Sequence, residues 1–195
     1  MAKRVAARER IIEAALATLQ EEGYAQASAR AIARTGGFNQ GLIYYHFDDL
    51  DDLFLEALDL TSRRRLERYR EAVEGCRTAS ELVAALKVLY AEDLAAGHVA
   101  AVQQLVAGAA RSPILGPGIV ERVGPWIDYC EEVARRFLAG GPFESLVDPR
   151  DLGFAVVAYY MGIETLGHLA PERSRADDLF ETAARFASLF DSMGS

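Results

Sequence analysis

Apolar residues recur at three- and four-residue spacing along almost the whole chain of 195 residues. The first such stripe consists of Ile11, Ile12, Ala15, Leu16 and Leu19. This spacing places side chains on one face of an α-helix, whereas a half-buried strand needs strict alternation, which we do not find. Glycine and proline separate the successive stripes. The pattern predicts an all-α protein.

Residues with capping chemistry predict where the first helices begin and end. Gly23 is placed to stop the first helix, and Ser28 is placed as the N-cap of a short second helix over 29–34. The acidic residues at 48–49 suit the positive N-terminal end of a fourth helix. The apolar stripe of that fourth helix continues to Val73, so we expect a long rod between two domains.

The stretch 39–47, Asn-Gln-Gly-Leu-Ile-Tyr-Tyr-His-Phe, concentrates aromatic rings in a chain that is otherwise aliphatic and alanine-rich. The Asn39 side chain can accept a hydrogen bond from a free amide of the first helical turn. Gly36 and Gly37 precede it and permit a tight turn with left-handed backbone. A short helix that points polar and aromatic side chains outward is what the DNA major groove admits. We therefore predict a recognition helix.

The side chains of this region divide into core and surface candidates. A domain this small needs apolar anchors, which we expect to be buried. The side chains expected in its core are Leu19, Ile32, Phe38, Ile43 and Phe47. Of the other rings, we expect at least one of Tyr44 and Tyr45 to be half-buried and His46 to be exposed.

The formal net charge of −8 is unevenly distributed. Residues 1–47 hold six lysines or arginines against four acids, and the remainder is strongly acidic. A slightly basic head suits contact with phosphate, and an acidic body does not. Cys76 and Cys130 lie inside helical patterns without a framework of spaced pairs, which favours a reduced setting. With no apolar leader, and with a longest apolar run (153–163) too short for a bilayer, we expect a cytoplasmic protein without membrane contact.

The last two helices, expected over 149–169 and 176–193, are unusually apolar. The first is hydrophobic nearly all round, so one small core cannot readily cover every face of it. The second carries a narrower stripe that includes Leu179 and Phe186. Together they predict a four-helix interface with a second copy of the chain. The alternative is that other helices of the same chain bury both faces.

Catalytic constellations are absent from the sequence. It has no glycine-rich phosphate loop, no Gly-x-Ser-x-Gly elbow and no His-Glu-x-x-His. We therefore expect no catalytic residues, no metal site and no cofactor. The competing hypothesis is a helical small-molecule-binding or enzyme-like protein whose DNA-binding head is not functional.

Residues 28–47, Ser-Ala-Arg-Ala-Ile-Ala-Arg-Thr-Gly-Gly-Phe-Asn-Gln-Gly-Leu-Ile-Tyr-Tyr-His-Phe, closely resemble the helix-turn-helix signature of TetR-type transcriptional repressors. The flanking matches are Arg10-Ile11, Ala14-Ala15, Gly23-Tyr24 and Leu53. The resemblance covers about the first quarter of the chain. It implies a three-helix DNA-binding domain over 5–65, which includes the start of the connecting helix. A helical ligand-binding and dimerisation domain would follow over 66–195.

The resemblance also implies which residues meet operator DNA. Gln40 and Leu42, early in the short helix, would reach base edges, and the aromatic residues after them would bind phosphates and fix the register. Gly41 would let the helix backbone approach closely. The full set of implied contacts is Ser28, Arg30, Asn39, Gln40, Gly41, Leu42, Tyr44, Tyr45 and His46.

Positions outside this set bear on the electrostatics of binding. By the same resemblance Lys3 and Arg4, expected on an arm before the first helix, would reach a neighbouring groove. The family usually has a lysine near Leu50. In this chain the position is leucine and its neighbours are aspartates, which predicts a weaker electrostatic contribution to DNA binding. The triple arginine 63–65 is expected to form a solvated or ion-paired face.

In such regulators the helical body binds a small molecule that changes DNA binding. The resemblance thus implies a homodimeric repressor released from its operator by a small apolar or aromatic effector. An apolar cavity with a few polar groups is the expected form of such a site. The candidates, polar or aromatic side chains that interrupt apolar stripes, are Tyr90, His98, Gln103, Trp126, Tyr129, Tyr160 and Glu164. Ordinary core or interface packing is the alternative for each of them.

Overall fold

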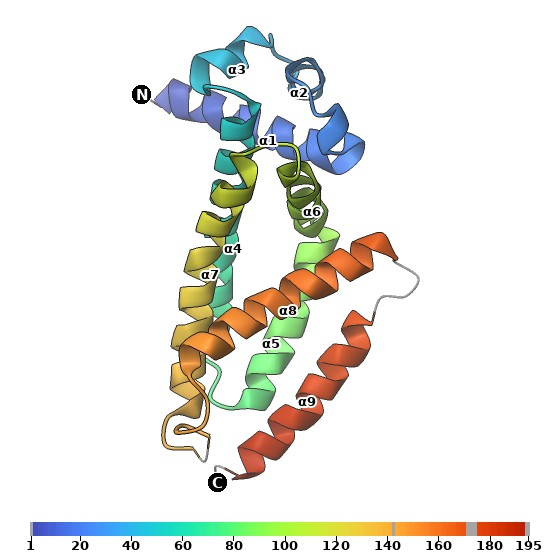
Figure 1. Ribbon diagram of the computed structural model, residues 1–195. Helices are drawn as coiled ribbons and strands as arrows, with labels where there is room; N and C mark the ends of the chain where they lie inside the picture. Colours follow the sequence, from blue (N-terminus) through green and yellow to red (C-terminus); the bar gives the residue numbers. More distant parts are fainter. Residues whose placement is uncertain (1, 142, 171–174, 194–195) are drawn as a thin grey trace. The chain divides into compact units, whose positions relative to one another are not determined.

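The computed structural model describes residues 2–141, 143–170 and 175–193 (Figure 1). Within these ranges the regular structure is helical and no strand occurs, which confirms the all-α prediction. The helices are α1 (Ala2–Glu22), α2 (Ala29–Gly36), α3 (Gly41–His46), α4 (Leu50–Glu74), α5 (Ala79–Ala95), α6 (His98–Ala109), α7 (Leu115–Leu138), α8 (Pro149–Leu169) and α9 (Ala176–Met193), with a 3₁₀ turn at Tyr24–Gln26. None of the helices that could be described is long and apolar enough to cross a membrane.

The chain divides into two compact units. The first unit consists of residues 1–64 and 96–122, and the second of residues 65–95 and 123–195. The α6 region therefore packs with the N-terminal helices, although it lies far along the sequence. The assignment of DNA binding to residues 5–65 and of ligand binding to 66–195 stays a prediction.

The caps predicted from the sequence hold the first helices in place. The Ser28 side chain accepts a hydrogen bond from the Ala31 amide at 3.3 Å and begins α2. Gly23 has a left-handed φ of 75° and ends α1. Asp49 Oδ1 accepts from the Asp52 amide at 2.8 Å and begins α4. The Ser28 and Asp49 contacts confirm the predicted starts of α2 and α4, because each satisfies an amide that a helix terminus leaves free. α2 continues to Gly36, beyond its predicted end at Arg34.

The start of α1 differs from the prediction. Lys3 and Arg4 lie within α1 rather than on an arm before it. The sequence from Ala2 to Arg10 contains neither glycine nor proline and is rich in alanine and arginine, which are strong helix formers. None of these residues would interrupt a helix.

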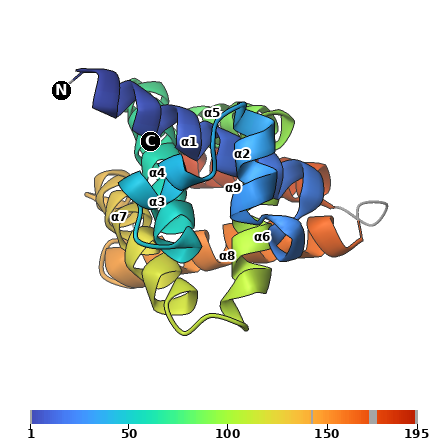
Figure 2. The ribbon, with the colours of Figure 1, turned by 90° about the horizontal axis from the view of Figure 1, so that it is seen from above.

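The core of the first unit lies where α1, α2, α3 and the start of α4 meet. Leu19, Ile32 and Ile43 have no exposed surface, as predicted. Figure 2 shows the chain passing from α2 to α3 through a short turn beside α1. Leu105 and Leu115, on α6 and at the start of α7, are also fully buried in this unit. The short α3 is thus supported by apolar burial rather than by its own length.

The second unit is built from the C-terminal part of α4 with α5, α8, α9 and most of α7. Its core centres on Tyr69, Leu89 and Tyr129. α5 and α9 lie side by side, and the Asp191 carboxylate accepts hydrogen bonds from the Ala79 and Ser80 amides at the start of α5 (Figure 1). This contact satisfies free amides at the N-terminus of α5.

Candidate functional site

The side chain that caps α3 belongs to Asn39, two residues before the helix begins at Gly41. The Asn39 side chain accepts a hydrogen bond from the Gly41 amide at 2.8 Å, as predicted. Gln40 already has helical dihedral angles, φ −55° and ψ −28°. Gly37, which ends α2, has φ 64° and ψ 42°, a left-handed conformation that glycine adopts without strain. Gly37 and Asn39 together set the direction in which α3 leaves α2.

Arg10 on α1 fixes the same turn from the other side. Its Nη2 donates to the carbonyl oxygens of Gly36 at 2.7 Å and Gly37 at 2.9 Å. Its guanidinium carbon lies 5.6 Å from the centre of the Phe38 ring, within cation–π range. A cation on the last carbonyls of α2 also suits the negative end of that helix.

The two predicted aromatic anchors behave differently. Phe47 is buried, which confirms its role in the core. Phe38 is only half-buried, so its prediction as a core residue is wrong. Its ring packs on the backbone of Gly36, where a Cβ would come within 2.1 Å of Phe38 Cε1. Phe38 thus covers the turn between α2 and α3 from outside.

The exposure of the rings on α3 reverses the prediction. Tyr44 is 57% exposed and Tyr45 is 70% exposed, so neither is half-buried as expected. His46, expected to be exposed, is half-buried, and its ring meets that of Tyr45 edge-on with centroids 5.0 Å apart. His46 follows Ile43 by three residues, so one helical turn brings it toward the buried side. The tyrosines are the aromatic side chains that α3 presents to solvent.

The polar residues around α3 form an open surface. Arg30, Asn39 and Gln40 are exposed and line a groove of about 520 Å³ between α2 and the start of α3. Arg34 is paired with Glu22 at 2.6 Å, whereas Arg30 forms no ion pair with any residue that the structure describes. Ser28 is exposed, although its hydroxyl already caps α2.

The acidic residues after α3 have internal partners. The Asp48 amide donates to Asp52 Oδ2 at 3.1 Å, which complements the Asp49 cap on the Asp52 amide. Asp51 accepts hydrogen bonds from the Tyr24 hydroxyl and from Ser112 Oγ. Leu50 is half-buried next to them. Where a lysine was expected, the chain thus has Leu50 beside aspartates that cap the start of α4.

The residues predicted to bind a ligand are divided between the units. His98 and Gln103, on α6, belong to the first unit. The remaining candidates, Tyr90, Trp126, Tyr129, Tyr160 and Glu164, all belong to the second unit. A single pocket that includes all of them does not form within either unit.

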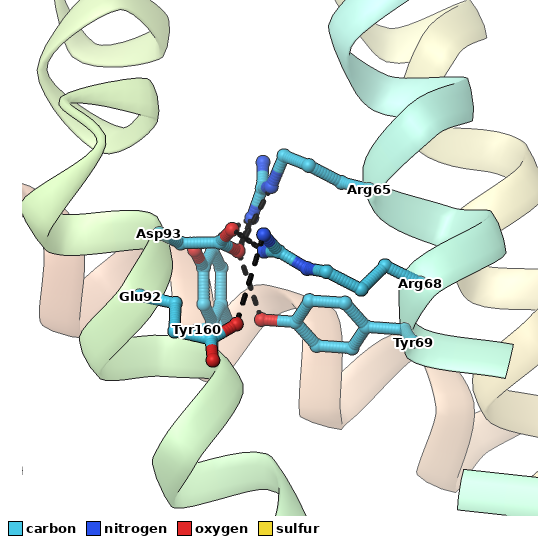
Figure 3. A network of polar contacts seen from close by, with 6 residues as sticks. All are labelled: Arg65, Arg68, Tyr69, Glu92, Asp93 and Tyr160. Atoms are coloured by element: carbon cyan, nitrogen blue, oxygen red, sulfur yellow. Dashed lines mark hydrogen bonds and ion pairs between the residues drawn. The ribbon is translucent and has the colours of Figure 1, made fainter. Parts of the chain in front are cut away.

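Asp93 on α5 is the centre of a buried polar network in the second unit (Figure 3). It has no exposed surface and accepts hydrogen bonds from Arg65 Nε at 2.8 Å and Nη2 at 2.5 Å. Arg68 Nη2 donates to Asp93 Oδ1, and the Tyr69 hydroxyl donates at 2.9 Å to Oδ2, the oxygen that also accepts from Arg65. Arg65 Nη2 also donates to the Tyr160 hydroxyl at 2.9 Å. Charge-assisted hydrogen bonds of this kind are the strong ones in proteins.

Aromatic side chains predicted as ligand contacts surround this network. The Trp126 ring meets the Tyr69 ring edge-on at 5.1 Å and lies 5.2 Å from the Arg65 guanidinium carbon. The Tyr129 hydroxyl donates to the Tyr69 carbonyl at 3.1 Å. Burial raises the pKa of Tyr160 to about 12, although the positive charge of Arg65 opposes the shift. These rings hold the network away from water.

Asp93 is not among the site residues predicted from the sequence, and one arginine of the run 63–65 differs from the other two. Arg63 and Arg64 form the expected surface ion pairs, with Asp59 and Glu9. Arg65 is also ion-paired, with Asp93, but its side chain is only 11% exposed, so this pair is buried rather than on a surface face. A signal was present: Asp93 continues the α5 stripe of Leu82, Leu86 and Leu89 at helical spacing.

The described ranges contain no group of three or more histidine, cysteine, aspartate or glutamate side chains arranged to hold a metal ion.

Comparison with known proteins places the N-terminal helices in a family. Residues 11–57 match the family "Bacterial regulatory proteins, tetR family". The HTH-type transcriptional regulator UidR of Escherichia coli (strain K12) is 31% identical over 106 residues, which are 54% of this chain and 53% of that protein. The chain thus spans about half the length of the curated relatives it matches.

Solved structures share the fold over nearly the whole chain. A Rhodococcus protein described as a TetR-family transcriptional regulator has a TM-score of 0.78 at 21% identity, covering 98% of this chain and 100% of that one. The transcriptional regulator FadR of Bacillus subtilis, solved in complex with stearoyl-CoA, has a TM-score of 0.71 at 20% identity, covering 96% and 98%. At these identities the likeness shows the fold alone. The match to the tetR family of bacterial regulatory proteins is carried by residues 11–57.

Proposed function

We propose that the protein is a DNA-binding transcriptional regulator, and more specifically a homodimeric repressor released from its operator by a small apolar or aromatic effector. The observation that carries the proposal is the placement of α3. Asn39 caps it, and Gly37 and Arg10 fix the turn that precedes it. Ile43 anchors its inner face while Tyr44 and Tyr45 are exposed on the other. A short helix held in this way suits insertion into a major groove.

The roles on this surface follow from chemistry. Gln40 and Leu42, at the start of α3, are suited to base edges, since glutamine can read adenine and leucine can touch a thymine methyl group. Tyr44 and Tyr45 are suited to phosphates, with His46 packed against Tyr45. Arg30 and Ser28 approach the backbone from α2. The proposed DNA contacts are therefore those expected from the sequence, except that His46 supports Tyr45 instead of contacting DNA itself.

Selection of bound duplexes from a random DNA pool tests DNA binding. We expect enrichment of a sequence with two half-sites related by two-fold symmetry. The double variant Tyr44→Ala/His46→Ala should lose binding to the selected duplex while its circular dichroism spectrum stays helical. Gln40→Ala should change which bases are preferred. If no sequence is enriched, or if the double variant binds as the wild type does, the recognition surface is assigned wrongly.

The exposed apolar side chains of α8 and α9 support dimerisation. Most of them lie at helical spacing, and a monomer rarely exposes so many large apolar groups on neighbouring helices. They are Phe154, Val156, Tyr159, Leu166, Leu169, Phe186, Leu189 and Met193. A second copy related by two-fold symmetry would cover them with the same surface.

Sedimentation of the purified chain tests the dimer. We expect twice the chain mass at micromolar concentration, and mostly single chains for Leu166→Glu, because a carboxylate would be buried without a partner. Val120→Glu is the matched control, since Val120 is as exposed but lies on α7 in the first unit. A monomeric wild type at that concentration would contradict the proposal.

A further inference from the structure

Glu164 on α8 is a buried carboxylate with incomplete hydrogen bonding. The residue is 3% exposed. The Tyr90 hydroxyl of α5 donates a hydrogen bond to its carboxylate. Its Oε1 is fully buried, and no donor reaches this atom from the residues that the structure describes. Most buried polar atoms in proteins are paired, so an unpaired carboxylate oxygen needs a reason.

The arginines of the neighbouring Asp93 network are engaged elsewhere. Arg65 donates twice to Asp93 and once to the Tyr160 hydroxyl. Arg68 is held by Asp93 and Glu92. Glu164 itself forms no ion pair within the described ranges. A buried carboxylate without a cation is costly in its charged form, and that cost disappears when a positive charge arrives.

Aromatic rings lie around Tyr90, the hydrogen-bond partner of the Glu164 carboxylate. The Tyr90 ring meets the Tyr160 ring edge-on with centroids 6.1 Å apart. It also lies 5.4 Å from the ring of Phe180 on α9. The faces of aromatic rings attract cations, most strongly where water is excluded. Rings together with an unpaired carboxylate are complementary to a positively charged nitrogen that carries apolar groups.

The charge at the edge of this region has the same sign. Asp177, at the start of α9, lies close enough to Tyr90 to contribute to the raised pKa of that tyrosine, after burial and the stronger effect of Glu164. The Asp177 side chain is 90% exposed, and its contact with Lys87 is long at 3.6 Å. An anionic ligand would meet Asp177 and Glu164 in succession. A cation would be attracted by both.

We propose that the Glu164 carboxylate binds the positively charged nitrogen of an organic cation, whose apolar groups pack against Tyr90, Tyr160 and Phe180. This inference rests on the proposed function, since it names the charge class of the proposed effector. The bound cation would touch Tyr160, whose hydroxyl accepts from Arg65 on α4. Binding would therefore act on the Asp93 network directly.

Titration of the full-length protein with paired probes tests the inference. One pair is benzyltrimethylammonium and its uncharged carbon isostere, neopentylbenzene. The bulkier pair is tetraphenylphosphonium and tetraphenylborate, which share a shape and differ in charge. Binding is followed by calorimetry and by the fluorescence of Trp126, the single tryptophan in the chain. We expect at least one cation to bind about tenfold or more tightly than its partner.

Glu164→Gln is the decisive variant, because it keeps the shape and a hydrogen-bond acceptor for Tyr90 while it removes the charge. It should bring the affinities of the paired probes to within about twofold of each other. Glu92→Gln is the matched control, because it removes an exposed carboxylate from the same region and should leave the cation preference intact. Equal affinity of both pairs for the wild type, or an unchanged preference in Glu164→Gln, would overturn the inference.

These titrations contain no DNA, so their result is independent of the proposed function. If the wild type prefers cations but selects no DNA, the cation site stands and the proposed regulatory function fails. If it selects DNA but shows no preference for cations, the regulatory function stands and the cation site fails. If both hold, the preferred cation should release the selected duplex from the wild type and leave Glu164→Gln bound to it.

Discussion

The Tyr24 hydroxyl donates a hydrogen bond to Asp51 Oδ1 at 3.2 Å and so ties the 3₁₀ turn after α1 to the first turn of α4. Ser112 Oγ donates to the other oxygen of Asp51 at 2.6 Å. The Tyr24 amide donates to Gln104 Oε1 on α6 at 3.1 Å, and a Cβ on Gly108 would come within 2.7 Å of the Tyr24 ring. Tyr24 is thus a point at which α4 and α6 are both attached to the N-terminal helices.

Replacing Tyr24 by phenylalanine should weaken this attachment without leaving a cavity. Asp51 keeps its bond from Ser112, so we expect a loss of about 1 kcal/mol in the free energy of unfolding. In a chain of this length that corresponds to a fall of roughly 2–4 °C in Tm. Tyr44→Phe removes an exposed hydroxyl and should leave Tm unchanged. Equal melting of the two variants would show that the bond to Asp51 contributes nothing.

Gly37→Ala should destabilise the turn that directs α3. The backbone at Gly37 has φ 64°, where a Cβ costs about 1–2 kcal/mol. Gly37→Asn should cost less, since asparagine tolerates this conformation. Gly75→Ala is the control, because a Cβ there meets nothing within 4 Å. Denaturant unfolding should rank the variants Gly75→Ala, Gly37→Asn and Gly37→Ala from most to least stable, and any other order contradicts the prediction.

Asp93→Ala should be severely destabilising. It leaves Arg65 and Arg68 converging on an empty position with no carboxylate between them, and removing one partner of a buried ion pair costs about 3–5 kcal/mol. The neighbouring Glu92 contacts Arg68 at 3.7 Å from an exposed position, so Glu92→Ala should cost about 0–1 kcal/mol. Chemical denaturation measures both. A loss of similar size in the two variants would mean that the network is not a stabilising unit.

Glu164→Gln should change how stability depends on pH. Burial raises the pKa of Glu164, and the Tyr90 hydrogen bond and the charge of Arg65 only partly offset the effect, while Asp93 reinforces it. Tyr160, one turn earlier on α8, is a further titratable neighbour. Because the folded-state pKa is raised, the protonated group favours folding below the unfolded pKa of about 4.3, and that advantage is lost as pH rises through the folded pKa.

The glutamine variant has no proton to lose at this position. We therefore expect the Tm of Glu164→Gln, relative to the wild type, to increase as the pH is raised from acid to neutral. Thermal melts across that range, without any ligand, provide the measurement. A difference that stays constant with pH would show that Glu164 titrates alike in the folded and unfolded states.

Arg30→Ala should weaken DNA binding evenly across sequences. A residue that contacts phosphate contributes about one unit to the slope of log affinity against log salt concentration. Arg34→Ala is the comparison, because Arg34 is already paired with Glu22. Binding of the selected duplex at several salt concentrations distinguishes the two. A slope that Arg30→Ala leaves unchanged would remove Arg30 from the interface.

The parts of the fold that depend on local chemistry were predictable from the sequence. Ser28, Asn39 and Asp49 accept hydrogen bonds from amides two or three residues away, so each boundary is encoded within one helical turn. Ile43 is fully buried, as expected for an apolar anchor of so small a domain. Such features need no knowledge of distant segments.

The parts that depend on distant partners were not predictable in the same way. Three consecutive arginines look alike in the sequence, yet successive helical residues point about 100° apart, so Arg65 turns inward while Arg63 and Arg64 stay outside. Only the packing of α5 against α4 brings Asp93 to Arg65. The exposure of Tyr45 and the partial burial of His46 likewise depend on which side of α3 the neighbouring helices cover.

The convergence of Arg65, Arg68 and Tyr69 on Asp93 has a consequence for how this protein can evolve. Loss of Asp93 alone would leave two arginines without their carboxylate, and loss of either arginine alone would leave the Asp93 carboxylate less well paired. Each single step is therefore costly, whereas an apolar replacement of the whole set need not be. Lineages that carry this protein should keep positions 65, 68 and 93 together or exchange them together.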